Sequence, residues 1–197
     1  MKGTVLYGPG DIRFEDRETP KIIEPTDAVL RLAATCVCGS DLWPYRGLQP
    51  IDGPTPMGHE YCGFVEEVGS AVKSVKPGRF VIGSFATSDN TCAHCLYGYQ
   101  SACTHREFMS RAQAPFLRVP LADGTLVPTP GGAPPDDLVP SLLCVLGRTG
   151  YRLVRRRRRR RKAGWHGSCC RRRRRRPTWC ALDQADGGRA DYRHEPS

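Results

Sequence analysis

The chain has 197 residues, of which 39% are hydrophobic and ten are cysteine, and a formal net charge of +10 at pH 7. This is enough for one domain, or one domain and a tail, and no apolar stretch approaches membrane-spanning length, which excludes a helical membrane protein. The first ten residues lack the apolar core of a secretory leader, so the cysteines are expected to bind metal in a reducing cytoplasm rather than to form a secreted disulfide framework.

Short strand candidates separated by turn residues occupy the first 85 residues. Alternating or β-branched apolar residues predict strands over 2–7, 12–15, 27–36, 61–68 and 80–83. Gly and Pro residues stand in several of the gaps between them, as turns require. This pattern of short strands and turns predicts a mainly β fold of the barrel or sandwich type, with little helix before residue 136. A helix is expected to begin in residues 136–146, because two acidic residues precede an apolar run.

Two boxes near the third strand candidate carry metal-ligand chemistry. The first is Cys38-Gly39-Ser40-Asp41 and the second, some twenty residues later, is Gly58-His59-Glu60. Cys38 and His59 supply the thiolate and imidazole that zinc prefers. Asp41 is expected to accept a hydrogen bond from the ligand His59, and Ser40 to pass on the proton of a substrate alcohol. Glu60 is predicted as an alternating ligand or a carboxylate next to the ligands.

In their order along the chain, these motifs resemble the N-terminal GroES-like catalytic domain of the zinc-dependent medium-chain alcohol dehydrogenases. The resemblance covers residues 1 to about 150. It rests on five segments that match the family in the same order along the chain: Gly8-Pro9-Gly10-Asp11-Ile12, Cys38-Gly39-Ser40-Asp41, Gly58-His59-Glu60, Val65-Glu66-Glu67-Val68-Gly69 and Lys76-Pro77-Gly78. It implies a partly open barrel with short helices over residues 1–146. It also implies a catalytic zinc at Cys38 and His59, with Ser40 in the proton relay. Relatives pass hydride between an alcohol or aldehyde and NAD(P).

The third protein ligand expected from this resemblance is missing. Relatives of the formaldehyde-dehydrogenase type place an Asp shortly before a Gly-Thr-Gly-Tyr segment, and residues 143–151 hold none. Cys144 is an alternative ligand there. Trp43 stands where many members have a His that extends the proton relay.

A second cluster follows, with the spacing Asp89-x2-Cys92-x2-Cys95-x7-Cys103. In the family, four Cys at this spacing hold a structural zinc, and here Asp89 replaces the first of them. An Asp and three Cys can close the site, or His94 or His105 can complete a three-thiolate site. The alternative is a lobe without metal and with free thiols.

The resemblance ends near residue 147, and no Gly-x-Gly-x-x-Gly turn for a dinucleotide occurs in the chain. We therefore expect the Rossmann domain to be absent, NAD(P) to have no site in this chain, and the chain as written to be inactive.

Residues 151–197 carry 17 Lys and Arg against 4 Asp and Glu, whereas the first 150 carry 13 against 16. Residues 147–197 are predicted to be a disordered low-complexity basic tail. An out-of-frame reading of GC-rich DNA over residues 147 to about 192 is one hypothesis for this tail.

The tail predicts a different class of function. The runs Arg155–Arg161 and Arg171–Arg176 would bind nucleic acid or other polyanions through phosphates. Because the runs carry no base-reading pattern, this binding is expected to be non-specific. The interpretations are therefore a zinc dehydrogenase domain and a zinc-binding module with a polyanion-binding arm.

Overall fold

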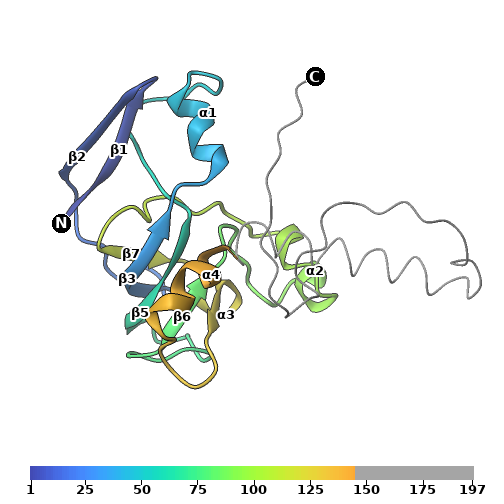
Figure 1. The fold of residues 1–197 in the computed structure, drawn as a ribbon. Coiled ribbons are helices and arrows are strands. Elements are labelled where there is room, and N and C mark those ends of the chain that lie inside the picture. The colour runs from blue at the N-terminus through green and yellow to red at the C-terminus, as the bar shows by residue number, and fades with distance from the viewer. Residues whose placement is uncertain (145–197) are drawn as a thin grey trace, which may run out of the picture. The chain divides into compact units, whose positions relative to one another are not determined.

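The structure, a computed structural model, describes residues 1–144. The predicted tail, its arginine runs and the end of the helix expected at 136–146 lie outside these residues. The described part is mainly β with short helices, as predicted (Figure 1). Its strands are β1 (Lys2–Gly8), β2 (Asp11–Asp16), β3 (Ala28–Cys36), β4 (Thr55–Pro56), β5 (Glu60–Val68), β6 (Phe80–Gly83), β7 (Phe116–Val119) and β8 (Leu126–Pro128).

The helical segments are short. The α-helices are α1 (Leu42–Tyr45), α2 (Ala93–Leu96), α3 (Ala122–Thr125) and α4 (Val139–Cys144), and the 3-10 turns are η1 (Gly39–Asp41), η2 (Gln100–Ala102) and η3 (Asp136–Leu138). Within residues 1–144, no helix is long and apolar enough to cross a membrane.

The strands form two antiparallel sheets. A three-stranded sheet has the order β2-β1-β4, and a five-stranded sheet has the order β7-β3-β5-β6-β8. All five strands predicted from the sequence are present. The sequence interpretation missed β4, β7 and β8, which have two to four residues each and therefore show almost no periodicity.

The pairing of β3 with β5 positions the first pair of metal-ligand boxes. Cys36 at the end of β3 lies opposite Glu60 at the start of β5. The box that follows β3 and the box that precedes β5 therefore meet at the same end of the sheet. The register shifts between Leu32 and Ala34, where Gly63 of β5 is buried; a Cβ on Gly63 would lie 2.2 Å from the Arg31 carbonyl oxygen. Only glycine allows this close approach of the two strands.

The core lies between the five-stranded sheet and the loops that cover it. Tyr61, Val65 and Leu30 are at most 1% exposed and belong to the main apolar cluster. A second cluster joins Phe80 of β6 to Leu143 of α4, which is 6% exposed. This contact explains why α4 stays on the sheet although it has only six residues: burial, rather than helix propensity, stabilises it.

The segment 89–105, here called the cysteine lobe, is built differently. It contains α2 and η2 but no strand, and its buried side chains include Cys95 and Cys103. Leu96 and Tyr97 are exposed, so the lobe buries little apolar surface of its own. A segment of this kind needs a crosslink or a metal to hold its conformation.

Candidate metal centres

The first centre, the Cys38 cluster, consists of Cys38, His59 and Glu60. One ligand atom from each residue lies within 4.8 Å of the others. Cys38 follows β3 and caps η1, while His59 directly precedes β5. Gly58, before His59, has φ +96°, and a Cβ there would lie 2.6 Å from the Gln113 nitrogen. The loop therefore requires glycine at this position to present His59 to the cluster.

Asp41 and Ser40 surround the two nitrogens of His59. Asp41 Oδ1 lies 3.3 Å from His59 Nδ1, and its Oδ2 accepts a hydrogen bond from the Cys38 backbone N–H at 2.8 Å. Ser40 Oγ lies 3.4 Å from His59 Nε2. The Asp41 carboxylate thus orients the imidazole from one side, and the other nitrogen faces the serine hydroxyl.

Charge in the Cys38 cluster is arranged for a cation. The hydrogen bond that His59 donates to the Asp41 carboxylate raises the pKa of His59 to about 9. Burial alone would raise the pKa of the Cys38 thiol, but hydrogen bonds from Ser40 and His59 outweigh it and lower that pKa. Without metal, His59 is therefore protonated at neutral pH, so a metal ion that binds here displaces a proton.

These residues fit a zinc ion. Thiolate, imidazole and carboxylate are the three ligand types that zinc accepts, and they converge within 4.8 Å. The hydrogen bond from His59 to a carboxylate is the arrangement that tunes ligand histidines elsewhere.

A cavity of about 580 Å³ opens onto the Cys38 cluster. Besides the cluster, its lining includes Cys144, the alternative ligand considered from the sequence, and two residues that sequence reasoning did not place in the site, Phe85 and Cys36. The ring of Phe85 meets that of His59 edge-on, at 6.3 Å between centroids. Cys36 donates a hydrogen bond to Glu60 Oε2 at 2.8 Å, and burial raises the pKa of its thiol to about 12. Since Cys36 stands two residues before Cys38 on an extended chain, strand alternation could have indicated it.

The second centre, the lobe cluster, consists of Asp89, Cys92, Cys95 and Cys103. Their ligand atoms lie within 4.8 Å of one another. Cys92 and Cys103 approach to 3.9 Å between sulfurs, and the His105 backbone N–H donates to Cys103 Sγ at 3.4 Å. Three sulfurs and a carboxylate at this range, with a backbone N–H directed at one sulfur, fit a closed zinc site. His94 is exposed and outside the group, so Asp89 is the fourth member in this structure.

Asp89 is held in the lobe cluster by His105. His105 Nδ1 lies 2.6 Å from Asp89 Oδ2, and Oδ1 accepts hydrogen bonds from the backbone N–H groups of Thr91 and Cys92. The hydrogen bond from His105 holds the pKa of Asp89 well below its usual range. The sequence analysis treated His105 as an alternative ligand, whereas the structure places it against the carboxylate.

His105→Gln is expected to weaken zinc binding at the lobe cluster by about 10–100-fold, because the Asp89 carboxylate loses the ring that orients it. Competition with a chromophoric chelator measures this affinity. The matched control is His94→Gln, which changes an exposed histidine of the same lobe and should leave the affinity unchanged. Equal affinities in the two variants would show that His105 does not position Asp89.

The family model of the alcohol dehydrogenase GroES-like domain matches residues 24–130, more than half of the chain and both clusters. The chain belongs to the zinc-type medium-chain alcohol dehydrogenase family. The GroES-like fold predicted from the sequence is thereby confirmed.

Curated relatives of this dehydrogenase domain include two fungal proteins. Zinc-type alcohol dehydrogenase B of Aspergillus flavus is 38% identical over 156 residues, which cover 77% of this chain and 36% of that protein. The medium chain reductase/dehydrogenase ucsI of Acremonium sp is 39% identical over 157 residues, which cover 77% of this chain and 53% of that protein. The chain thus spans between about a third and about half of the length of these relatives.

Solved structures of alcohol dehydrogenases share the fold. Zinc dependent alcohol dehydrogenase 2 from Streptococcus pneumonia, apo form, has 37% identity and a TM-score of 0.61, covering 66% of this chain and 39% of that one. TADH from Thermus sp. ATN1 has 29% identity and a TM-score of 0.62, with 66% and 40% covered. The alcohol dehydrogenase rspB from Escherichia coli CFT073, complexed with the cofactor NADH, has 26% identity and a TM-score of 0.55, with 66% and 39% covered.

Proposed function

We propose that residues 1–146 form the zinc-binding catalytic domain of an enzyme that interconverts an alcohol and an aldehyde by hydride transfer with NAD(P). The observation that carries this proposal is the convergence of Cys38, His59 and Glu60 beside a cavity of about 580 Å³. Membership of the zinc-type family and the NADH-bound relative support it. Zinc, when bound, acts as a Lewis acid on the substrate oxygen.

The side chains of the Cys38 cluster have separate roles in this proposal. Cys38 and His59 hold the zinc, and Glu60 is an exchangeable third carboxylate ligand in place of the Asp that this chain lacks. Asp41 orients His59 through the 3.3 Å contact with Nδ1. Ser40, whose hydroxyl lies next to His59 Nε2, would relay the proton of the substrate alcohol: its oxygen takes that proton while its own hydroxyl proton passes to solvent. Phe85 excludes water from one side of the cavity.

The nicotinamide cofactor has no assigned residues here. The sequence holds no glycine-rich dinucleotide turn. The zinc of the lobe cluster, held by Asp89, Cys92, Cys95 and Cys103, is proposed to stabilise the lobe and to take no part in the reaction.

A cobalt experiment tests substrate binding without the cofactor. Cobalt in place of zinc at the Cys38 cluster should give visible absorption bands, and a primary alcohol such as benzyl alcohol should shift them, because a catalytic site keeps one position open. Cys103→Ser, which perturbs the closed lobe cluster, is the control that should retain the alcohol-dependent shift. Bands from a loaded Cys38 cluster that no alcohol or aldehyde shifts would contradict the proposed function.

A second function is proposed for the tail on sequence grounds. The thirteen arginines of Arg155–Arg161 and Arg171–Arg176 would bind nucleic acid without sequence preference. The full chain should then bind a DNA duplex with an affinity that falls steeply with salt, roughly 10³-fold or more between 50 and 200 mM. A version ending at residue 150 is the control and should not bind. Binding that survives high salt, or that discriminates between sequences, would contradict non-specific binding.

The state of the cysteines bears on the cellular compartment of the protein. All seven cysteines of the described part are free thiols, and five of them belong to the two clusters or donate a hydrogen bond to a member of one. Thiols kept for metal binding suit a reducing compartment, so we propose a cytoplasmic location.

A further inference from the structure

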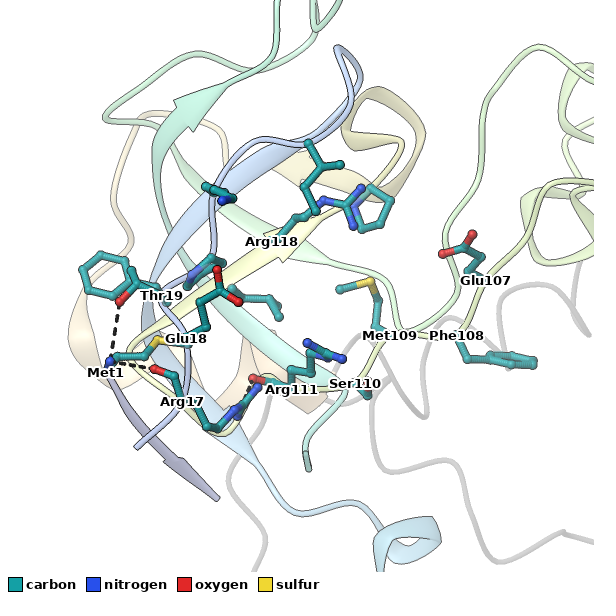
Figure 2. Close-up of a pocket in the computed structure, with 16 residues that line it drawn as sticks. Met1, Arg17, Glu18, Thr19, Glu107, Phe108, Met109, Ser110, Arg111 and Arg118 are labelled. Atoms are coloured by element: carbon teal, nitrogen blue, oxygen red, sulfur yellow. Dashed lines mark hydrogen bonds between the residues drawn. The ribbon is translucent and has the colours of Figure 1, made fainter. Parts of the chain in front are cut away.

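Figure 2 shows the residues that line a further cavity, of about 430 Å³. Its walls come from the segment that follows β2, from residues 107–111 and from β7, and no member of either cluster lines it. This size suits a small organic ligand. Nothing in the proposed dehydrogenase chemistry uses this cavity.

Three cationic side chains without an acidic partner line the cavity: Arg17, Lys21 and Arg111. Within residues 1–144, no carboxylate lies within 4 Å of their charged nitrogens. Arg118, which also lines the cavity, differs because Asp27 neutralises it with Nε···Oδ2 at 2.6 Å. The acids Glu18 and Glu107 share the rim, both exposed and outside any ion pair of the described part.

Arg17 and Arg111 are held together at one end of the cavity. Arg17 Nη1 lies 3.5 Å from the Arg111 carbonyl oxygen, and Figure 2 shows the two side chains next to each other. Burial, followed by the charge of Arg111, lowers the pKa of Arg17. The positive charges of Arg17 and Arg111 repel each other, and an anion bound beside them would relieve this repulsion.

The backbone is shaped to keep this pair in place. Arg17 packs over Gly3 of β1, where an added Cβ would lie 2.7 Å from Nη1 and 2.8 Å from Cδ of Arg17. Arg111 has φ +76°, a conformation that few non-glycine residues adopt. Glycine in β1 and the left-handed turn at Arg111 therefore bring the two guanidinium groups to the same cavity.

Apolar side chains share the rest of the lining with the polar Thr19 and Ser110. Met109 and Leu117 are 8% and 2% exposed, and Ile23 and Phe116 add further apolar surface. A ligand for this cavity therefore combines an anionic group with an apolar or neutral part.

We propose that this cavity binds a small organic phosphate, with Arg17, Lys21 and Arg111 as the cationic ligands of the phosphate group. Three cationic groups match the double negative charge of a phosphate better than the single charge of a carboxylate. Arginine also binds phosphate through paired N–H donors. The apolar wall of Met109 and Leu117 receives the organic part.

Residue-resolved NMR of the full chain, with inorganic phosphate as the probe, tests this proposal. Because tail arginines also attract phosphate, the readout is the set of backbone amides in segments 17–23 and 107–111, at constant ionic strength against chloride. Saturable shifts at these amides are expected for phosphate and not for chloride. Phosphate shifts no larger than those with chloride would overturn the proposal, and acetate binding as tightly as phosphate would overturn the assignment to phosphate.

Three variants locate the site. Arg17→Gln and Arg111→Gly should each weaken phosphate binding about tenfold or more, and the glycine suits the left-handed backbone at 111. Gly3→Ala keeps every charge but displaces the Arg17 side chain, and should weaken binding as Arg17→Gln does. Arg46→Gln changes an exposed arginine outside the cavity and is the control. Unchanged affinity in Gly3→Ala and Arg17→Gln would overturn the role of Arg17.

Discussion

Serine in place of Cys38 is expected to empty the Cys38 cluster while the lobe cluster keeps its metal. The total zinc should fall from about two to about one ion per chain, because a hydroxyl is a far weaker zinc ligand than a thiolate. The loss of zinc affinity should exceed roughly 10–100-fold, which is the cost of removing a residue that hydrogen-bonds a ligand. Elemental analysis after dialysis against a weak chelator measures the stoichiometry.

The matched control for Cys38→Ser is Cys36→Ser. Cys36 lies two residues earlier and donates its thiol hydrogen to Glu60, and its pKa is raised to about 12. A thiol that stays protonated is a poor ligand, and serine can make the same hydrogen bond. Cys36→Ser should therefore retain both metals. If the two variants lose metal equally, Cys38 is not the thiolate ligand that we propose.

Alanine in place of Asp27 is expected to lower the free energy of unfolding by about 3–5 kcal/mol, the cost of breaking a buried ion pair by removing one partner. The Asp27 side chain is fully buried. Its oxygens accept hydrogen bonds from Arg118 and from the backbone N–H groups of Ile23 and Glu24. This carboxylate joins the loop before β3 to strand β7, so its loss leaves four donors unsatisfied. Urea denaturation of the zinc-loaded chain measures the change.

Asp11→Ala is the matched control for Asp27→Ala. Asp11 also forms a two-point pair with arginine, at 3.0 and 2.7 Å from Arg13, but both side chains are about half exposed. Exposed pairs contribute little to stability, since water and salt screen them, so Asp11→Ala should be far less destabilising than Asp27→Ala. If the two alanine variants are equally stable, burial does not decide the contribution of the Asp27 pair.

The sequence by itself determined the mainly β class, five of the eight strands in residues 1–144 and the family. Local pattern was enough for these, because strand alternation, turn residues and the Cys38 and His59 boxes are contiguous in the chain. The compositions of both clusters could also be predicted, since motif spacing and the resemblance limit which residues share a loop. The domain boundary at 146 and the roles of the ligands stay predictions.

Only the tertiary structure decided which distant side chains meet. His105 lies against Asp89, Arg118 against Asp27 across 91 positions, and Arg17 against Arg111 across 94. Each contact depends on strand order and register, which set the placement of whole segments and leave no local periodicity to read. Motif spacing therefore indicates the members of both clusters, but it could not place Phe85 beside His59 or reveal the cationic cavity.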